Sequence, residues 1–165
     1  MSEKGQTVII GFYHEYEEHG CFSNWYPCRF TIDGVEYHSS EQYMMAQKVI
    51  LFGRKDLAEQ IMATDDPQKA KHIAGQHFPE YDDSLWGAKC YETVKKGVKA
   101  KFEQNPDIRE ELLSTGNAIL CECAPHDKRW GIGIGLDDPA YQHVEKWRGK
   151  NYLGFILMEV RAELA

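Results

Sequence analysis

The segment Ser39–Lys48 constrains the fold more than any other part of the chain. Ser39 is followed three residues later by Gln42, a capping-box pattern that predicts the start of a helix. The residues that follow are apolar on nearly every side of that helix, which predicts that it is buried. These apolar residues are Met44, Met45, Ala46, Val49, Ile50, Leu51 and Phe52.

Two ionisable residues share one face of this helix. Glu41 lies in the first turn and Lys48 follows seven residues later, ~10 Å along the axis and just under two turns on. Ionised groups are costly to bury unless they are paired or used. An internal salt bridge, or a Lys that reaches past apolar neighbours to solvent, is one interpretation. Catalysis is the other. Helical side chains lean toward the N-terminus, so the two charged groups stay about one sugar apart, and in an apolar site a Lys becomes a usable nucleophile and a Glu suits acid–base work.

The rest of the pattern predicts an α+β fold, mostly helical with a small β-sheet. Strands are expected at Thr7–Tyr13 (buried), Arg29–Ile32, Val35–Tyr37 and Ala118–Cys123, the middle two joined by the hairpin turn Asp33-Gly34. Helices are expected at Arg54–Ala63, Pro67–Gln76, Asp83–Glu103 and Pro106–Ser114, and after Asn151 as N-cap. At 165 residues with no repeat or boundary signal, the chain predicts a single domain over residues 1–165.

The longest expected helix, Asp83–Glu103, has a core stripe at helical spacing. That stripe comprises Tyr91, Val94, Val98 and Phe102. Trp86 lies off the stripe, so we expect it either to line a pocket or to cover a neighbouring element. A solvated face is predicted for Lys95, Lys96, Lys99 and Lys101.

The segment Pro125–Lys150 has little periodicity but contains several aromatic residues, which argue against disorder. Its stretch Trp130–Gly135 looks like a glycine-rich phosphate loop, although it does not join a strand to a helix, and its glycines equally fit plain turns. Asp127, just before it, fits a turn-capping role better than a catalytic one on its own. The cations Lys146, Arg148 and Lys150 are candidates for holding a phosphate.

Composition limits the possible partners and location. The net charge of −7 gives no general attraction to nucleic acid or anionic membrane, although a local basic cluster would still bind a nucleotide. Five cysteines without a repeated CxxC predict reduced thiols, and Cys121-x-Cys123 with His126 supplies too few ligands for structural zinc. Without a signal peptide or a membrane-length apolar run, we expect a cytoplasmic protein with no membrane partner.

Several short blocks in a fixed order resemble the NADAR/YbiA-like family over nearly the whole chain. They are Phe22-Ser23-Asn24-Trp25, Ser40-Glu41-x-Tyr43-x-x-Ala46-Gln47-Lys48, Trp86, His126-Asp127-x-x-Trp130-Gly131 and Asn151-x-Leu153-Gly154. The resemblance implies a YbiA-like α+β fold and an N-glycoside hydrolase that needs no cofactor and no metal. The expected substrate is guanine carrying ADP-ribose, alone or in nucleic acid, and the products are ADP-ribose and the free base.

Two other functions stay open beside this one. The first is hydrolysis of phosphoribosylamino-pyrimidine intermediates of riboflavin synthesis to ribose 5-phosphate and free base. The second is a non-catalytic module that binds ADP-ribose or NAD. The small-molecule nucleotide is the expected partner in each case, and the oligomeric state is left open.

The resemblance also implies roles for individual residues. Glu41 matches the family's catalytic glutamate, Lys48 a lysine that forms a Schiff base with the sugar, and Trp86 and Asp127 match further active-site residues. The expected substrate-binding residues are Phe22, Ser23, Asn24, Tyr43, Trp130, Gly131 and Gly133. Ile132 departs from the pattern, because some relatives carry an acidic residue there, so no metal or charge role is expected at this position.

Overall fold

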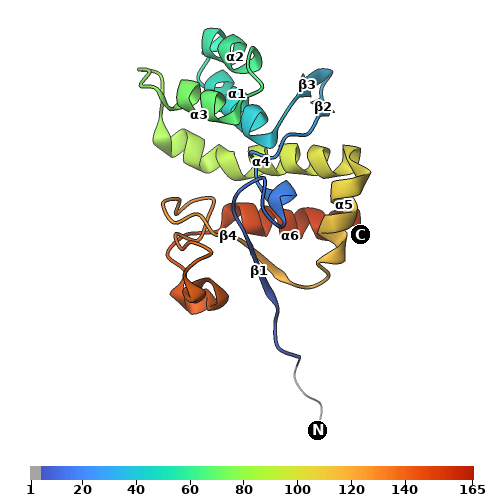
Figure 1. The fold of residues 1–165 in the computed structure, drawn as a ribbon. Helices are drawn as coiled ribbons and strands as arrows, with labels where there is room; N and C mark the ends of the chain where they lie inside the picture. Colours follow the sequence, from blue (N-terminus) through green and yellow to red (C-terminus); the bar gives the residue numbers. More distant parts are fainter. Residues whose placement is uncertain (1–4) are drawn as a thin grey trace. The chain divides into compact units, whose positions relative to one another are not determined.

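The computed structural model describes residues 5–165. The chain forms two compact units, one made of Asn24–Arg109 and the other of the segments Met1–Ser23 and Glu110–Ala165. The prediction of a single domain over residues 1–165 stays a prediction. Six α-helices and two short two-stranded sheets lie within residues 5–165, so the predicted α+β, mostly helical fold is confirmed (Figure 1).

The unit Asn24–Arg109 consists of a β-hairpin followed by four helices. Its elements are β2 (Phe30–Ile32), β3 (Val35–Tyr37), α1 (Ser40–Leu51), α2 (Lys55–Met62), α3 (Pro67–Gly75) and α4 (Asp83–Gln104). The strands pair antiparallel around Asp33 and Gly34, whose positive φ angles of 51° and 80° suit a tight hairpin turn. Helix α1 contacts α2, α3 and α4 and forms the centre of the unit. The predicted hairpin and helices are therefore confirmed here.

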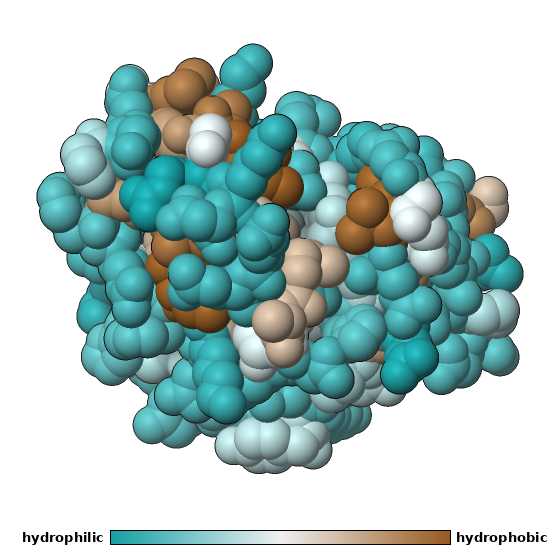
Figure 2. Space-filling model, turned by 90° about the horizontal axis from the view of Figure 1, so that it is seen from above, coloured by the Kyte–Doolittle hydropathy of each residue, from teal (hydrophilic) through white to brown (hydrophobic). Residues whose placement is uncertain are grey.

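Helix α1 is buried over its first part only. Residues 40–46 and Val49 are buried, whereas Ile50 and Leu51 in the last turn are 46% and 36% exposed. The prediction of a helix buried throughout is wrong for this turn, because apolar residues on nearly every side of a helix do not reveal which side faces solvent. Figure 2 shows a face of the molecule on which polar residues predominate and hydrophobic ones form separate groups.

The buried face of α4 is wider than the predicted stripe, of which Val94, Val98 and Phe102 are buried and Tyr91 is half-buried. Trp86, Cys90, Val94 and Gly97 are buried at helical spacing, and Lys101 follows one turn later at 1% exposure. Trp86 is thus buried on the same face of α4 as Val94. The residues between and beyond them on this face, Cys90 and Gly97, are small, so the face does not appear as a row of large apolar residues. The prediction that Lys101 lies on a solvated face is also wrong. Its ammonium group lies 5.2 Å and 5.6 Å from the ring centres of Phe102 and Tyr26.

The second unit contains a parallel strand pair from distant parts of the chain. Its elements are β1 (Ile9–Phe12), η1 (Gly20–Phe22), β4 (Ile119–Glu122), η2 (Pro139–Gln142), η3 (Val144–Lys146) and α6 (Tyr152–Leu164), and α5 (Pro106–Ser114) crosses into it. Ile9 pairs with Ile119 at the start of the ladder, and α6 contacts β4. Phe12 is fully buried but Val8 is 61% exposed, so β1 is buried at one end only.

Asn151 lies directly before α6 with a left-handed φ of 55°. Its side chain makes no capping bond to the helix, contrary to the predicted cap. Instead Oδ1 accepts from the Glu122 N–H at 3.1 Å, and Nδ2 donates to the Leu120 carbonyl at 3.0 Å. These groups lie on the edge of β4 opposite β1, where a third strand would otherwise bind. The Asn151 amide provides hydrogen-bond partners for both backbone groups on this edge, since one Asn side chain offers both a donor and an acceptor.

Candidate functional site

The first turn of α1 is fixed by hydrogen bonds on two sides. The Ser39 hydroxyl accepts from the Gln42 N–H at 3.0 Å, as the capping box predicts. The Gln42 side chain accepts from the His38 N–H at 2.8 Å and donates to the carbonyls of Thr64 (2.8 Å) and Ile61 (3.3 Å). Gln42 therefore ties the start of α1 to the end of α2, a link that the capping pattern alone did not reveal.

Glu41 lies within this fixed turn and is 4% exposed. Its N–H donates to the Asn24 carbonyl at 2.9 Å, and the hydroxyl of Ser40 donates to Asn24 Oδ1 at 2.8 Å. Asn24, predicted to bind substrate, thus also anchors the turn that carries Glu41. The first turn of a helix favours a negative charge, because unpaired backbone N–H groups point toward it.

Lys48 lies two turns further along α1 and is half-buried. Its Nζ is 5.0 Å from the ring centre of Tyr81. The Tyr81 hydroxyl donates to Asp83 Oδ1 at 2.8 Å, in the first turn of α4. Tyr81 lies in the connection between α3 and α4, which has no periodic pattern, so no sequence pattern indicates this contact.

The remaining predicted residues of this unit are buried. Trp86 is 4% exposed in the first turn of α4, which Asp82 caps by accepting from the Ser84 N–H at 2.9 Å. Tyr43 packs directly on Gly97, where an added Cβ would lie 2.3 Å from the Tyr43 ring. Burial, with smaller contributions from Tyr37 and Asp33, raises the pKa of Tyr43 to about 12. Tyr43 has a packing role in this unit, and its contact with substrate stays a prediction.

Asp127 belongs to the other unit and holds a turn. Its Oδ1 accepts from the N–H groups of Arg129 (3.0 Å) and Trp130 (2.9 Å), which is the turn-capping role considered from the sequence. Burial raises the pKa of Tyr13, and the negative charges of Glu122 and Asp127 raise it further. A catalytic role for Asp127 stays a prediction.

The glycine-rich segment after Asp127 is part of the packed interior. The Ile132 N–H donates to the Glu122 carbonyl at 2.9 Å, and the Ile132 carbonyl accepts from Arg148 at 2.8 Å and Gly149 at 2.9 Å. Gly131 is needed for close packing, since an added Cβ would lie 2.8 Å from Ala124. The Ile132 N–H is therefore already used within the fold and does not serve as a phosphate donor.

The side chains around this segment explain why residue 132 is apolar in this chain, whereas the family resemblance led us to expect an acidic residue in some relatives. Ile132 and Ile134 form a buried cluster with Cys121 and Cys123. An acidic side chain in this apolar cluster would be costly, so an apolar residue fits the position. The Cys121 and Cys123 sulfurs are 3.8 Å apart, and the pKa of Cys121 is raised by the Cys123 thiol and by burial. The five cysteines are free thiols.

The other predicted binding residues of this unit have structural partners. Phe22 is 1% exposed and contacts the rings of Phe12 and His19. Ser23 is buried, and its N–H donates to the Gly20 carbonyl at 3.0 Å. The Trp130 ring meets that of Tyr152 edge-on at 5.9 Å, and Gly133 has a φ of 71°. Substrate contacts of Phe22, Ser23, Trp130, Gly131 and Gly133 stay predictions.

The predicted residues fall into two sets by unit. Asn24, Glu41, Tyr43, Lys48 and Trp86 lie in Asn24–Arg109. The second set, in the other unit, comprises Phe22, Ser23, Asp127, Trp130, Gly131 and Gly133.

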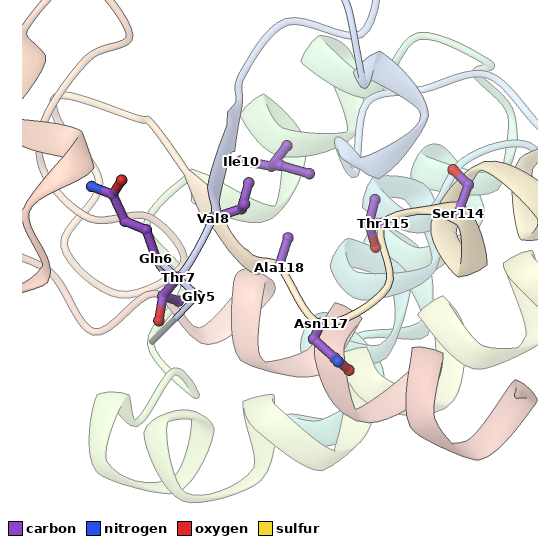
Figure 3. Close-up of a pocket in the computed structure, with 9 residues that line it drawn as sticks. All are labelled: Gly5, Gln6, Thr7, Val8, Ile10, Ser114, Thr115, Asn117 and Ala118. Carbon is purple, nitrogen blue, oxygen red and sulfur yellow. The ribbon is translucent and has the colours of Figure 1, made fainter. Parts of the chain in front are cut away.

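A cavity of about 440 Å³ lies elsewhere in the second unit (Figure 3). The N-terminal segment with β1 forms one side and the connection from α5 to β4 the other. Its lining residues are Gly5, Gln6, Thr7, Val8, Ile10, Ser114, Thr115, Asn117 and Ala118. None of these nine is charged or was predicted as a site residue, so the cavity offers no carboxylate or amine for the chemistry considered above.

Residues 5–165 lack both a cluster of metal-binding side chains and a helix of membrane-spanning length and apolarity. They contain no group of three or more His, Cys, Asp and Glu side chains arranged to hold a metal ion. Within the same range, no helix is long and apolar enough to cross a membrane.

The fold and the α1 arrangement define an α+β protein with a buried carboxyl and a half-buried amine on one central helix. Residues 11–165 match the model of the NADAR domain, and the chain belongs to the NADAR domain family. The predicted relationship is therefore confirmed.

Individual relatives agree with this assignment. The chain is 39% identical over 147 residues to an N-glycosidase of Acanthamoeba polyphaga mimivirus, covering 86% of each protein. It is 32% identical over 160 residues to N-glycosidase YbiA of Escherichia coli (strain K12), covering 97% of this chain and 91% of YbiA. The NMR structure of E. coli YbiA matches with a TM-score of 0.79 at 31% identity, covering 96% of this chain and 86% of that one.

A further relative is longer than this chain. A riboflavin biosynthesis protein of Vibrio vulnificus (strain YJ016) is 34% identical over 155 residues, which are 94% of this chain and 38% of that protein.

Proposed function

We propose that this chain is an N-glycosidase that hydrolyses the bond between ADP-ribose and a guanine base, releasing ADP-ribose and the unmodified base. The observation that carries the proposal is that buried Glu41 and half-buried Lys48 lie on the same helix, α1. The names of the mimivirus and E. coli relatives support N-glycosidase activity in general. The net charge of −7 favours a single nucleotide over long nucleic acid.

Glu41 is suited to proton transfer at the glycosidic bond. The Asn24 carbonyl fixes its backbone and Gln42 fixes the neighbouring turn, so the carboxyl starts from a defined position. A general acid must protonate the departing amine, and the resulting carboxylate then activates water. Positioned proton transfer of this kind typically contributes about 10²–10⁴ in rate.

Lys48 supplies a nucleophile for a stepwise route. A ribose joined to an exocyclic amine opens to a protonated imine at C1′ when Glu41 donates a proton to the ring oxygen. The neutral Lys48 amine adds to C1′ and gives one of its protons to the Glu41 carboxylate. Glu41 passes this proton to the base as it departs, and the sugar remains bound to Lys48 as a protonated imine. Water then adds at C1′, supplies the aldehyde oxygen and releases the Lys48 amine. The simpler route is direct hydrolysis through an oxocarbenium-like state, in which Glu41 acts as the acid and then as the base that activates water.

Borohydride separates these two routes. Reduction during turnover converts the protonated imine to a stable amine, so mass spectrometry should find the sugar mass on the peptide that contains Lys48. Lys48→Arg should abolish both adduct and turnover, whereas Lys69→Arg, on the exposed side of α3, should change neither. An active wild type without any adduct would favour direct hydrolysis.

A second substrate is favoured by one relative. The name of the Vibrio protein supports a phosphoribosylamino-pyrimidine of riboflavin synthesis as the substrate. Both substrates carry a ribose on an exocyclic amine, so the same Glu41 and Lys48 chemistry applies. Comparing kcat/KM for an ADP-ribosylated guanine oligonucleotide and a phosphoribosylamino-pyrimidinone decides between them. The proposal is wrong if the pyrimidinone is preferred.

The non-catalytic alternative predicts binding without turnover. We expect Glu41→Gln to lower kcat by at least 10²-fold, with ADP-ribose affinity nearly unchanged in calorimetry. Glu59→Gln, the same change at an exposed position of α2, should keep full activity. If neither wild type nor Glu41→Gln releases a base while both bind ADP-ribose, the protein is a binding module.

A further inference from the structure

Three aromatic rings form a closed cluster beside Lys48. Phe52 follows the end of α1, whereas Phe78 and Tyr81 lie in the connection from α3 to α4. The ring centres are 5.8 Å apart for Phe52–Phe78, 5.3 Å for Phe52–Tyr81 and 5.7 Å for Phe78–Tyr81. Each ring therefore contacts both others, at angles typical of favourable aromatic pairs.

The Tyr81 ring is held from several directions. Its hydroxyl donates to Asp83 at 2.8 Å, and its backbone N–H donates to the Phe78 carbonyl at 3.2 Å. Phe78 is itself 3% exposed and has the Arg54 guanidinium 5.6 Å from its ring centre. A ring anchored at its backbone, its hydroxyl and one edge presents a fixed face to Lys48.

That face attracts the cationic form of the Lys48 side chain. The Nζ lies 5.0 Å from the Tyr81 ring centre, within the range of cation–π attraction. A lysine side chain has many rotamers and loses them at a cost in entropy, so a fixed aromatic face restricts where the amine lies. The protonated imine proposed above is also a cation at the same nitrogen and is attracted in the same way.

We propose that Tyr81 is a positioning residue for Lys48, whose ring face holds Nζ in the cationic forms of the catalytic cycle. This inference rests on the proposed function, because it assigns Tyr81 a role in that reaction. Tyr81 keeps the nitrogen in place while water releases the sugar. The hydrogen bond to Asp83 restricts the Tyr81 ring, and the ring face in turn restricts the position of the Lys48 amine.

Substitutions at Tyr81 separate the ring from its hydroxyl. Tyr81→Leu removes the aromatic face, and we expect kcat and the borohydride-trapped adduct to fall about 3–30-fold, with KM changing less than about twofold. Tyr81→Phe keeps the ring face and loses the hydrogen bond to Asp83, so both quantities should stay within about threefold of wild type. Phe52→Leu is the matched control, because it removes a ring of the same cluster other than the one under Lys48.

Melting temperatures show whether the cluster has only a structural role. Tyr81→Leu and Phe52→Leu should lower the melting temperature similarly, while only Tyr81→Leu lowers kcat and adduct yield. Equal losses of kcat in the two variants would overturn the proposal. Loss of kcat in Tyr81→Phe as large as in Tyr81→Leu would overturn it as well, since the ring face is then not the feature that matters.

A measurement without substrate keeps this inference distinct from the proposed function. Reductive methylation with ¹³C-formaldehyde labels the lysine amines, and the NMR signal missing from Lys48→Arg identifies Lys48. We expect the ring current of Tyr81 to shift this signal upfield in wild type and Tyr81→Phe relative to its position in Tyr81→Leu. If wild type lacks the upfield shift, the Tyr81 proposal fails. If the shift is present but neither substrate is hydrolysed, the proposed function fails and the catalytic role of Tyr81 fails with it, while the contact itself stands.

Discussion

Replacing Asn151 tests whether one side chain stabilises the outer edge of β4. The amide is fully buried and bonds the Glu122 N–H and the Leu120 carbonyl. Removing it leaves two buried backbone groups without partners, at about 1–3 kcal/mol each. Asn151→Ala also puts at a φ of 55° a residue that tolerates this left-handed region less well than Asn, which adds at most about 1–2 kcal/mol. The expected loss of roughly 2–8 kcal/mol is comparable to the whole stability of a typical domain, about 5–15 kcal/mol.

Asn151→Gly separates the two contributions, because glycine tolerates positive φ and lacks the amide. We expect it to lose about 2–6 kcal/mol. With a urea slope of about 1–3 kcal/mol per M, the midpoint should fall by about 0.7 M or more. The assay is urea unfolding followed by tryptophan fluorescence and by circular dichroism. A midpoint within about 0.3 M of wild type would refute the reasoning, since the two bonds would then contribute almost nothing.

Asn151→Asp tests the same geometry through pH. The introduced carboxyl still accepts from the Glu122 N–H but donates to the Leu120 carbonyl only when protonated, so folding should raise its pKa. Stability from the protonated form is present below the unfolded pKa and is lost as the pH rises through the folded one. The variant should therefore lose more stability relative to wild type at about pH 8 than at about pH 5.

Three further predictions concern packing, ionisation and the Asp127 turn. Gly97→Ala should lower stability by about 1–3 kcal/mol in urea unfolding, because its Cβ would lie 2.3 Å from the Tyr43 ring; an unchanged midpoint would contradict this contact. Spectrophotometric titration should show the Tyr43 hydroxyl half-ionised only near pH 12. The neutral hydroxyl's contribution to the free energy of unfolding is complete below pH 10.0 and should fall as the pH rises toward 12. If the difference spectrum between wild type and Tyr43→Phe showed ionisation near pH 10, this prediction would be wrong. Asp127→Asn should have a melting temperature close to that of wild type, since the Asn side-chain oxygen still accepts from the N–H groups of Arg129 and Trp130. Asp127→Ala should lose about 1–2 kcal/mol of stability. A drop in kcat for Asp127→Asn without a loss of stability would support a catalytic carboxylate.

Local rules predicted the elements whose signals are local. Ser39 caps α1 through the bond that its spacing to Gln42 implies, and Asp33 and Gly34 adopt the positive φ angles of a hairpin turn. These features depend on a few adjacent residues, so the sequence contains all the information needed to predict them. The family blocks then indicated Glu41 and Lys48, which α1 does place on a single helix.

The wrong predictions involve residues whose role is set by distant partners. The predicted stripe of α4 was too narrow, because Gly97 contributes no side chain to the pattern and yet is buried where Tyr43 packs against it. Asn151 was expected to cap a helix, but its amide bonds a strand thirty residues earlier in the chain. Tyr81 was missed because a ring beside Lys48 arises from the path of a connecting segment and not from any periodic pattern.

The pairing of β1 with β4 has a consequence for how the protein is made. The strand β1 pairs with β4 only after Ile119 has been synthesised, because Ile9 pairs with Ile119. The whole of Asn24–Arg109 is synthesised between these two residues. At about 5–20 residues per second, β1 stays without its partner strand for several seconds after it leaves the ribosome. During that time the uncharged segment Thr7–Tyr13, rich in β-branched and aromatic residues, is open to pairing with other nascent chains. The contiguous unit can fold first, whereas the parallel strand pair is completed only near the end of synthesis. Ribosomes stalled between these two strands should therefore carry chains that bind chaperones.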